Sequence, residues 1–290
     1  MAIRLVAALI VLLLAFSQVD FTRVRNFAWF RSWLAQLRFA EGGGRIAIAL
    51  ALPVIVCALI QRALYGWGFG AAGVVFAALV LIYTLGPREP EADIDAVLTA
   101  PDAPARESAA QELRDDAGAA PLPFTSPALV EAAVLAGLRR RFGVLFWFFL
   151  IGPVGALLYR LAQVAANDGG GELDLRARDG ARRFAAALDW LPAHLMVLAM
   201  ALVSDFEAVL HAWRAWHAQP GRSPWELEPG FLAAVARSGV DADIEAGDGG
   251  AVADVSDPLE ELADARRLLI RVLVVWLAVV ALIVLAGWVA

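Results

Sequence analysis

Long apolar runs are the feature that most limits what this chain can fold into. Five of them have the length and composition of membrane-crossing helices, and they cover residues 3–19, 46–63, 70–86, 144–165 and 269–290. A sixth run, 186–204, contains Asp189, Pro192 and His194 and has an ambiguous hydropathy. The chain is 60% hydrophobic, with a mean hydropathy of +0.66, whereas soluble domains are about 45–50% apolar. The predicted fold class is therefore all-α, a polytopic membrane protein.

The arginines predict how these runs are oriented, because positive residues concentrate at the cytoplasmic ends of membrane spans. They cluster in the first loop (23–45), at 139–141 and at 266–271. The last two clusters each precede an apolar run, so both runs enter from the same side and the run 186–204 must cross between them. We predict about six transmembrane helices with both termini outside. Arg182 and Arg183 would then lie outside, which argues against this arrangement.

Two polar segments separate the membrane regions. Residues 87–143 are acidic and rich in alanine and proline up to about 124, which predicts short helices and flexible linker, and 205–265 contain a Gly/Asp-rich stretch. We expect both on the cytoplasmic side. The chain then divides into an N-terminal membrane region (1–86), the first polar segment (87–143), a central membrane region (144–204), the second polar segment (205–265) and a C-terminal transmembrane helix (266–290).

Each polar segment ends in the same helix-starting pattern. The stretches "TSPALVEA" and "SDPLEELA" offer a capping Ser126 or Asp257, a proline at the first helical position and an acidic residue in the first turns. Each predicted helix then reaches an arginine cluster and continues into an apolar run. We expect two long helices that pass from water into lipid.

Two amphipathic segments are expected to lie in the membrane interface. Residues 21–39 place apolar side chains at helical spacing opposite Arg31 and Arg38, and these side chains are Phe27, Phe30, Leu34 and Leu37. Residues 205–217 also place apolar side chains along one side of a predicted helix, and these are Phe206, Val209, Leu210, Trp213 and Trp216. Packing against the lipid bilayer is the first interpretation. A surface for a membrane or cytoplasmic partner protein is the alternative.

Composition excludes several kinds of chemistry. All 24 basic residues are arginine, so no lysine is present for a P-loop nucleotide site or a Schiff base. Cys57 is the single cysteine, which excludes an intramolecular disulfide and a cysteine zinc site. His194, His211 and His217 match no metal motif. We expect no metal, no cofactor and no nucleic acid partner. No nucleophile–base arrangement marks a catalytic residue, which argues against a self-sufficient enzyme and leaves enzymatic activity open.

Small residues interrupt the fourth run at Gly152, Pro153 and Gly155. Proline removes a backbone hydrogen bond and kinks a helix, and the glycines allow a neighbouring helix to approach closely. A kink that serves helix packing is the simpler interpretation. A discontinuous helix that lines a binding cavity, as in transporters, is the alternative.

Asp189 is the strongest candidate for a cavity or ligand contact, since an ionisable group within a span is costly and normally faces a polar cavity or a partner. A helix cap or an ion pair is the structural alternative. His194, Arg160 and Tyr159 are further candidates for such a contact. Histidine is the side chain whose ordinary pKa lies near neutral pH, so one interpretation is that His194 responds to pH, but a hydrogen-bonded helix histidine is the preferred interpretation. Tyr159 and Arg160 close the fourth run, and an ion pair between Arg160 and Asp189 would join two runs. Glu131 is expected on a solvated helix face.

Three stretches resemble a known family. They are "YTLGPREPEADIDAVL" (83–98), "RRFGVLFWFFLIGPVGALLYRL" (140–161) and "ALDWLPAHLMVLAMAL" (187–202). They are similar to the AmpE proteins, inner-membrane modulators of β-lactamase induction, which resemble in turn the CobD/CbiB membrane proteins of cobalamin biosynthesis. The resemblance implies a multi-pass protein of the bacterial inner (plasma) membrane and a signalling role linked to cell-wall recycling and the antibiotic response. His194 stands where the AmpE pattern has an arginine.

The alternative function is a CobD-like membrane enzyme, or enzyme subunit, that acts on a phosphorylated small molecule or a corrinoid. CobD-type chains carry Asp-Pro and His-Pro near the first span and a Thr-Leu-Asp motif after the fourth. Here the first pattern is absent, and "QVAANDGGGELDLRARDG" replaces the second. A small-molecule transporter is the further alternative, favoured by the interrupted fourth run.

Overall fold

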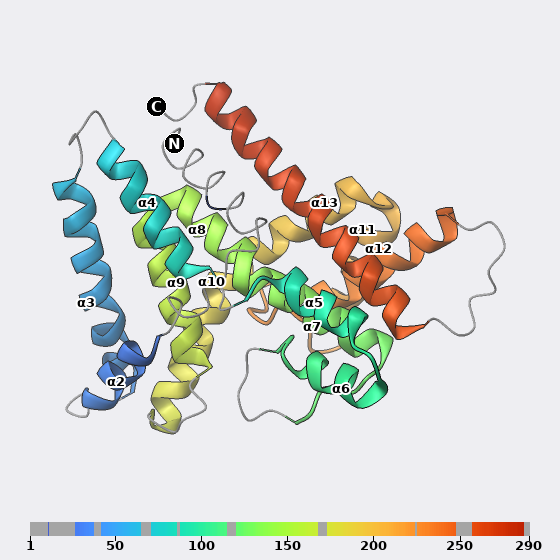
Figure 1. Ribbon diagram of the computed structural model, residues 1–290, viewed down its shortest axis with the longest axis horizontal. Helices are drawn as coiled ribbons and strands as arrows, with labels where there is room; N and C mark the ends of the chain where they lie inside the picture. The colour runs from blue at the N-terminus through green and yellow to red at the C-terminus, as the bar shows by residue number, and fades with distance from the viewer. Residues whose placement is uncertain are drawn as a thin grey trace.

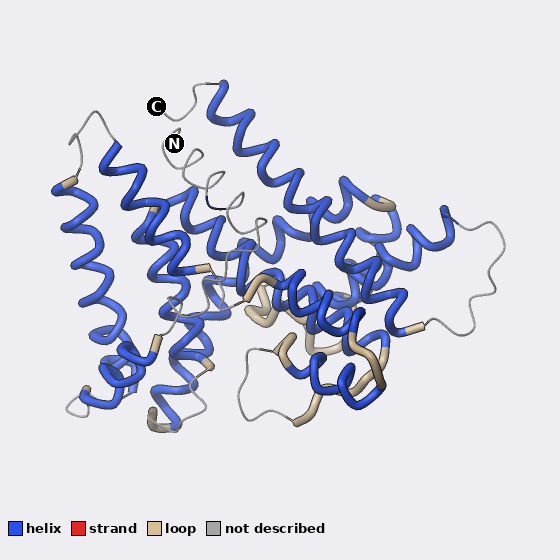
Figure 2. Tube along the Cα trace, in the orientation of Figure 1, coloured by secondary structure: helices blue, strands red, loops and turns tan. Residues whose placement is uncertain are grey.

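The structure, a computed structural model, describes Val11 and residues 27–37, 42–64, 71–85, 88–114, 120–167, 173–223, 225–247 and 257–286, with the backbone alone over 241–247. Most of these residues form helices, and none of the described residues belongs to a strand (Figure 1, Figure 2). The predicted all-α class is confirmed.

Three helices are long and apolar enough to cross a membrane. They are α3 (Gly42–Ala63), α10 (Leu175–Val203) and α13 (Pro258–Leu285). They contain the predicted run 46–63, all but the last residue of the run 186–204, and most of the last run. The ambiguous run 186–204 therefore has the length and hydropathy of a span once the whole helix is counted. The chain is a membrane protein with three candidate spans among its described residues.

The other predicted spans are shorter or not described. The run 70–86 forms α4 (Ala71–Thr84), an apolar helix of 14 residues. At 1.5 Å per residue such a helix is about 21 Å long, less than the ~30 Å hydrocarbon core of a bilayer. The run 3–19 lies outside the described residues, except for the buried Val11. Six spans are not confirmed.

The run 144–165 forms two helices instead of the one kinked span predicted. α8 (Gly143–Ile151) ends before Gly152, and α9 (Pro153–Ala166) begins after it. Gly152 has a φ of 92°, a conformation that favours glycine because it has no side chain. Pro153 occupies the first turn of α9, where its missing N–H is not needed. The predicted kink is therefore a complete break between helices.

These two helices fold back on each other as a hairpin. A side-chain carbon at Gly155 would collide with the backbone carbonyl of Trp147, and one at Gly143 would collide with the ring of Tyr159. Both glycines therefore permit a close antiparallel approach. The predicted single span is thus two helices, of 9 and 14 residues, that pack as a hairpin.

A continuous helical segment leads into the hairpin. α7 (Ser126–Gly137) passes through a π-helical turn, η2 (Leu138–Phe142), into α8. The N-cap of α7 is Thr125, without a side-chain capping hydrogen bond, so the predicted cap Ser126 lies inside the helix. The cap predicted for α13 is confirmed, because the Asp257 carboxylate accepts a hydrogen bond from the backbone N–H of Leu259 at 3.0 Å.

The acidic stretch after residue 87 forms the short helices predicted for it, α5 (Pro90–Thr99) and α6 (Ala103–Gln111). The acidic side chains of α5 and its N-cap are not all solvated, because they pair with arginines of η2 and α13. The pairs are Arg140–Asp93, Arg141–Glu91, Arg141–Glu89 and Arg266–Asp95. These ion pairs hold α5 against both helices that lead into apolar runs.

The two predicted amphipathic segments are helices. α2 (Ala28–Gln36) and its flanking residues bury the predicted apolar side chains Phe27, Phe30, Leu34 and Leu37, while Arg31 is exposed. α11 (Phe206–His217) packs on α12 (Phe231–Gly247) and buries Val209, while Phe206 stays exposed. The apolar face of α2 thus contacts protein, where contact with lipid was predicted.

α3 and α10 begin at the same end of the molecule, since a side-chain carbon at Gly180 would lie 4.0 Å from the Cα of Gly43. Arg182 and Arg183 therefore lie at the end where α3 begins, and not on the opposite side as the six-span arrangement required. In Figure 1, α3 lies to the left of the hairpin, α13 lies to its right, and α6 lies below α5 and α7.

Candidate functional site

Asp189 lies in the middle of α10 with 2% of its surface exposed, surrounded by polar groups from α9 and η2. Its Oδ1 accepts hydrogen bonds from the Tyr159 hydroxyl at 2.6 Å and from the Gln163 Nε2 at 2.8 Å. Its Oδ2 lies 3.7 Å from the Arg139 Nε. Both carboxylate oxygens thus face donors, as a buried charge requires. We call Asp189, Tyr159, Gln163 and Arg139 the Asp189 cluster.

This geometry decides between the structural alternatives for Asp189. The residue is far from either end of α10, so it is not a helix cap. It forms an ion pair, but its partner is Arg139 and not Arg160. The Arg160 guanidinium instead lies over the Phe27 ring, 5.5 Å from its centroid. Arg160 therefore links the hairpin to α2.

His194 belongs to a different environment from Asp189. Its Nδ1 lies 2.7 Å from the Trp190 carbonyl, and because a carbonyl only accepts, Nδ1 donates this hydrogen bond. Its ring packs against the rings of Trp190 and Phe231 at centroid distances of 4.4 and 4.7 Å. His194 thus faces α12, whereas Asp189 faces α9 and η2. The structure brings Tyr159 and Asp189 together and leaves His194 and Arg160 apart from them.

The break at Gly152 positions the Asp189 cluster. Because α9 turns back along α8, the Tyr159 ring lies against Gly143. On the same hairpin, the Trp147 Nε1 donates a hydrogen bond to the Leu188 carbonyl at 3.1 Å. The hairpin is therefore joined to α10 by hydrogen bonds at two consecutive residues, 188 and 189. The predicted kink residues hold the helices that carry the site and do not line it themselves.

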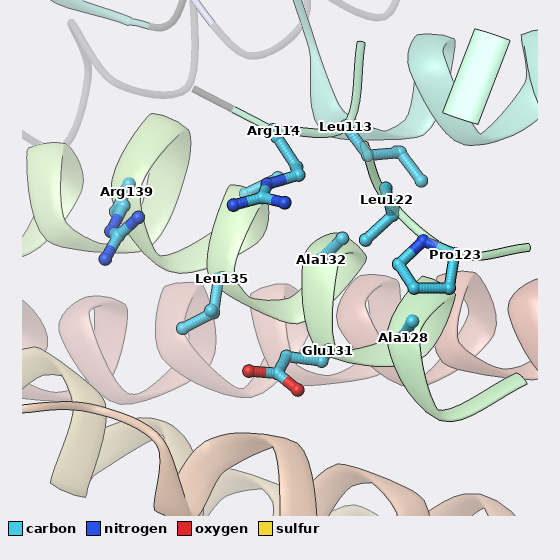
Figure 3. Close-up of a pocket in the computed structure, with 10 residues that line it drawn as sticks. Leu113, Arg114, Leu122, Pro123, Ala128, Glu131, Ala132, Leu135 and Arg139 are labelled. Carbon is cyan, nitrogen blue, oxygen red and sulfur yellow. The ribbon is translucent and has the colours of Figure 1, made fainter. Parts of the chain in front are cut away.

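A pocket of about 340 Å³ lies beside Arg139, between α7 and the chain that follows α6 (Figure 3). Its apolar wall includes Leu113, Leu122 and Leu135, and its charged groups are Arg114, Glu131 and Arg139. Figure 3 shows the Arg114 side chain reaching over α7 from the segment after α6. We call this the arginine pocket. With two guanidinium groups and one carboxylate, its charged side chains carry a net positive charge.

Local hydrogen bonds fix the wall of the arginine pocket. The Gln111 amide makes two hydrogen bonds with the backbone of Leu122, donating to its carbonyl at 3.1 Å and accepting from its N–H at 2.8 Å. The Arg114 Nη1 donates to the Ala120 carbonyl at 2.9 Å. Leu122 is thus held against the end of α6, and Arg114 is held to Ala120.

Arg139 belongs to both the arginine pocket and the Asp189 cluster. Its side chain is 27% exposed, and its Nε is buried without a hydrogen-bond partner. The 3.7 Å separation from Asp189 is longer than a hydrogen bond. Arg139 therefore neutralises Asp189 only across a gap and retains donors for a second anion.

The neighbouring arginines of η2 are held more firmly. Arg140 pairs with Asp93 and also donates to the Glu112 carbonyl at 2.8 Å, and Arg141 pairs with Glu91 and Glu89. Burial raises the pKa of the Asp93 carboxyl, and Arg140 lowers it by less. Ionising this buried pair thus costs free energy. We interpret the pairs as fixing the orientation of η2, and with it the direction of Arg139.

Sequence reasoning missed three members of this site. Gln163 had a usable signal, because it lies four residues after Tyr159 and so shares a helix face with it. Arg139 was used only to orient a span. Arg114 carried no signal in the sequence, since it reaches the pocket through the fold of the segment after α6.

Comparison with curated proteins finds one similar stretch. The chain is 35% identical over 94 residues to the cobalamin biosynthesis protein CobD of Chromobacterium violaceum. That stretch is 32% of this chain and spans 29% of the relative's length. No protein-family model and no solved structure matches the chain. The comparison supports the distant similarity to CobD/CbiB proteins, and it does not support the AmpE assignment.

Proposed function

We propose that this chain is a CobD-like membrane protein that binds a phosphorylated small molecule in the arginine pocket. The observation that carries the proposal is Arg139, which lies in the pocket and faces the buried Asp189. The stretch of similarity to CobD favours the same class of function. If the protein is an enzyme or an enzyme subunit, both the pocket and the buried carboxylate of Asp189 have a use.

The pocket's chemistry supports a phosphate in particular. Arg114 and Arg139 each offer a planar guanidinium, which binds phosphate through paired, charge-assisted hydrogen bonds. A phosphate monoester carries about −1.5 to −2 charge at neutral pH. The leucines of the wall lower the local dielectric, which strengthens such charge pairs.

We also propose a membrane topology, in which the arginine pocket lies on the cytoplasmic side of the bacterial inner membrane. This is supported by Arg139, Arg140 and Arg141, since arginines concentrate on that side. Ion pairing brings Arg266 of α13 to the same end as η2 through α5. A cytoplasmic pocket would have access to soluble phosphorylated metabolites.

The proposal is tested by sulfate and inorganic phosphate binding to the full chain, purified in detergent. Hydrogen bonds to charged groups contribute about 1.5–3 kcal/mol, so we expect Arg114→Gln and Arg139→Gln each to weaken binding about tenfold or more. Isothermal titration calorimetry measures the affinity. Arg176→Gln is the matched control, because Arg176 is exposed at the start of α10.

Equal affinity in wild type and both pocket variants would contradict the proposal. A loss of affinity that is the same in Arg176→Gln would also contradict it, because it would then reflect overall charge and not the pocket.

An AmpE-type modulator of β-lactamase induction is the second candidate. It is favoured by Asp189, which lies in the stretch that resembles the AmpE proteins best and which is buried at the centre of the polar cluster. Cefoxitin-induced β-lactamase activity in a host deleted for this gene tests it. Rescue by wild type and failure of Asp189→Ala, at equal protein level, would support the modulator. A transporter, suggested by the break at Gly152, would require flux into proteoliposomes.

A further inference from the structure

We infer that an anion bound in the arginine pocket is taken up together with one proton, which binds to Asp189. The inference rests on the proposed function, because it requires that the pocket binds an anion through Arg139. It adds to that function a coupling between a water-facing pocket and a carboxyl group buried in the helix bundle. Arg139 is the positioning residue that links them.

Among the residues that the structure describes, Arg139 is the one counter-charge that faces Asp189. From α9, Tyr159 and Gln163 face the carboxylate, and both are neutral donors. From η2, Arg139 faces it at 3.7 Å. α8, which carries Trp147 against the neighbouring Leu188, has no ionisable side chain.

Other cationic groups on helices packed against α10 have partners away from Asp189. They include Arg160 of α9 over the Phe27 ring, Arg45 of α3 on the Leu34 carbonyl, Arg237 of α12 on the Ala233 carbonyl, His217 of α11 on the Trp213 carbonyl, and Arg266, Arg267 and Arg271 of α13 on Asp95, Asp264 and the Val203 carbonyl. On α10 itself, His194 is bonded to the Trp190 carbonyl. Asp189 therefore depends on Arg139 for its charge balance within the described residues.

The contacts of η2 show which arginine is able to change partner. Arg140 and Arg141 are buried and held by carboxylates of α5 and its N-cap. Arg139 is 27% exposed, lines the pocket and has an Nε without a hydrogen bond. An anion in the pocket would compete with Asp189 for this guanidinium. The firmly held neighbours keep η2 in place while Arg139 moves.

Loss of Arg139 leaves a carboxylate in a site of low dielectric without a counter-charge. Such groups neutralise by binding a proton, because an isolated buried charge is energetically unfavourable. The proton comes from solvent through the pocket and forms an O–H bond at Oδ2, the oxygen that Arg139 had faced. Oδ1 continues to accept hydrogen bonds from Tyr159 and Gln163. One proton is thus taken up for each anion, and no other bond is made or broken.

The test measures sulfate binding to the detergent-solubilised full chain. Sulfate keeps its charge between pH 6 and 8, so any proton taken up belongs to the protein. Titration calorimetry in buffers of different ionisation enthalpy gives the number of protons bound per sulfate. We expect a value near one in wild type, and an affinity that falls about tenfold for each unit of rising pH, as linkage requires.

Asp189→Asn removes the titrating group but keeps its size and its acceptor oxygen. We expect no proton uptake, an affinity that does not change with pH, and tighter sulfate binding than wild type at pH 8, because the competitor for Arg139 is gone. Asp179→Asn is the matched control, since Asp179 is an exposed carboxylate near the start of α10 and does not line the arginine pocket. It should retain the proton uptake of wild type.

A second variant covers the case in which Asp189→Asn does not fold. Tyr159→Phe removes one donor to the carboxylate, so protonation becomes easier and proton uptake should extend to higher pH.

Sulfate binding through Arg114 and Arg139 without proton uptake would overturn the coupling and leave the proposed function standing. Proton uptake that survives Asp189→Asn or vanishes in Asp179→Asn would overturn it too. Absence of sulfate binding, or binding indifferent to both arginines, would remove the proposed function itself.

Discussion

At the residue scale, the structural role of Asp189 depends on where it lies in its helix. Near a predicted span end, an aspartate followed by a proline is a good candidate for a helix cap. In the middle of a helix of 29 residues it is instead a buried charge that needs donors from other elements. Tyr159, Gln163 and Arg139 supply them from two elements. Its surroundings therefore come from tertiary packing.

Gly143 offers a residue-scale prediction. A methyl group at this position would overlap the Tyr159 ring, which hydrogen-bonds Asp189. We expect Gly143→Ala to lower the free energy of unfolding by about 1–3 kcal/mol, as overpacking does. Thermal unfolding in detergent measures the change. Gly73→Ala is the control, because nothing lies within 4 Å of the added carbon, and in a helix this change should stabilise by roughly 0.5–1 kcal/mol.

At the element scale, α5 holds the π-helical turn by ion pairs. Buried ion pairs of this kind add little stability, since the cost of desolvation offsets their attraction. They do restrict geometry, because each buried arginine must meet its carboxylate. The stretch "REPEADID" (88–95) therefore acts as a structural part of the site, whereas its composition predicted only short helices and flexible linker.

Two variants test this role of α5. Asp93→Ala leaves Arg140 buried without its carboxylate, and we expect a loss of about 3–5 kcal/mol in the free energy of unfolding. Asp93→Leu combined with Arg140→Met should return to within about 1 kcal/mol of wild type. Chemical or thermal unfolding in detergent supplies the values. If the double variant is as unstable as Asp93→Ala, hydrophobic replacement fails and the pair is a net source of stability.

At the scale of the whole molecule, the sequence predicted the helical class, the three long apolar helices and the helix starts near residues 126 and 257. It did not predict the hairpin, because hydropathy reports apolar length and not chain direction. Reversal at Gly152 depends on the glycines at 143 and 155, which act through contacts between α8 and α9. In the same way, Asp189 was identified from its rarity in an apolar run, whereas its partner depended on how η2 packs.

The orientation of α10 gives a prediction for the whole molecule. Because Gly180 lies next to Gly43, the starts of α3 and α10 should face the same side of the membrane. In a Cys57→Ala background, single cysteines at the exposed Arg31 and Arg176 should react with a membrane-impermeant maleimide from the same side. Labelling from opposite sides would restore the six-span arrangement, in which the residues around 182 lie outside.

The π-helical turn has a consequence for comparing this chain with related sequences. Successive residues of an α-helix lie about 100° apart around the axis. A relative with one residue fewer between Leu138 and Phe142 would therefore direct the side chain at position 139 to a different face, even with all three arginines retained. Chain length in this turn, as much as residue identity, would separate proteins that have the Asp189–Arg139 pair from those that lack it. A gap in an alignment at this point is informative about the site.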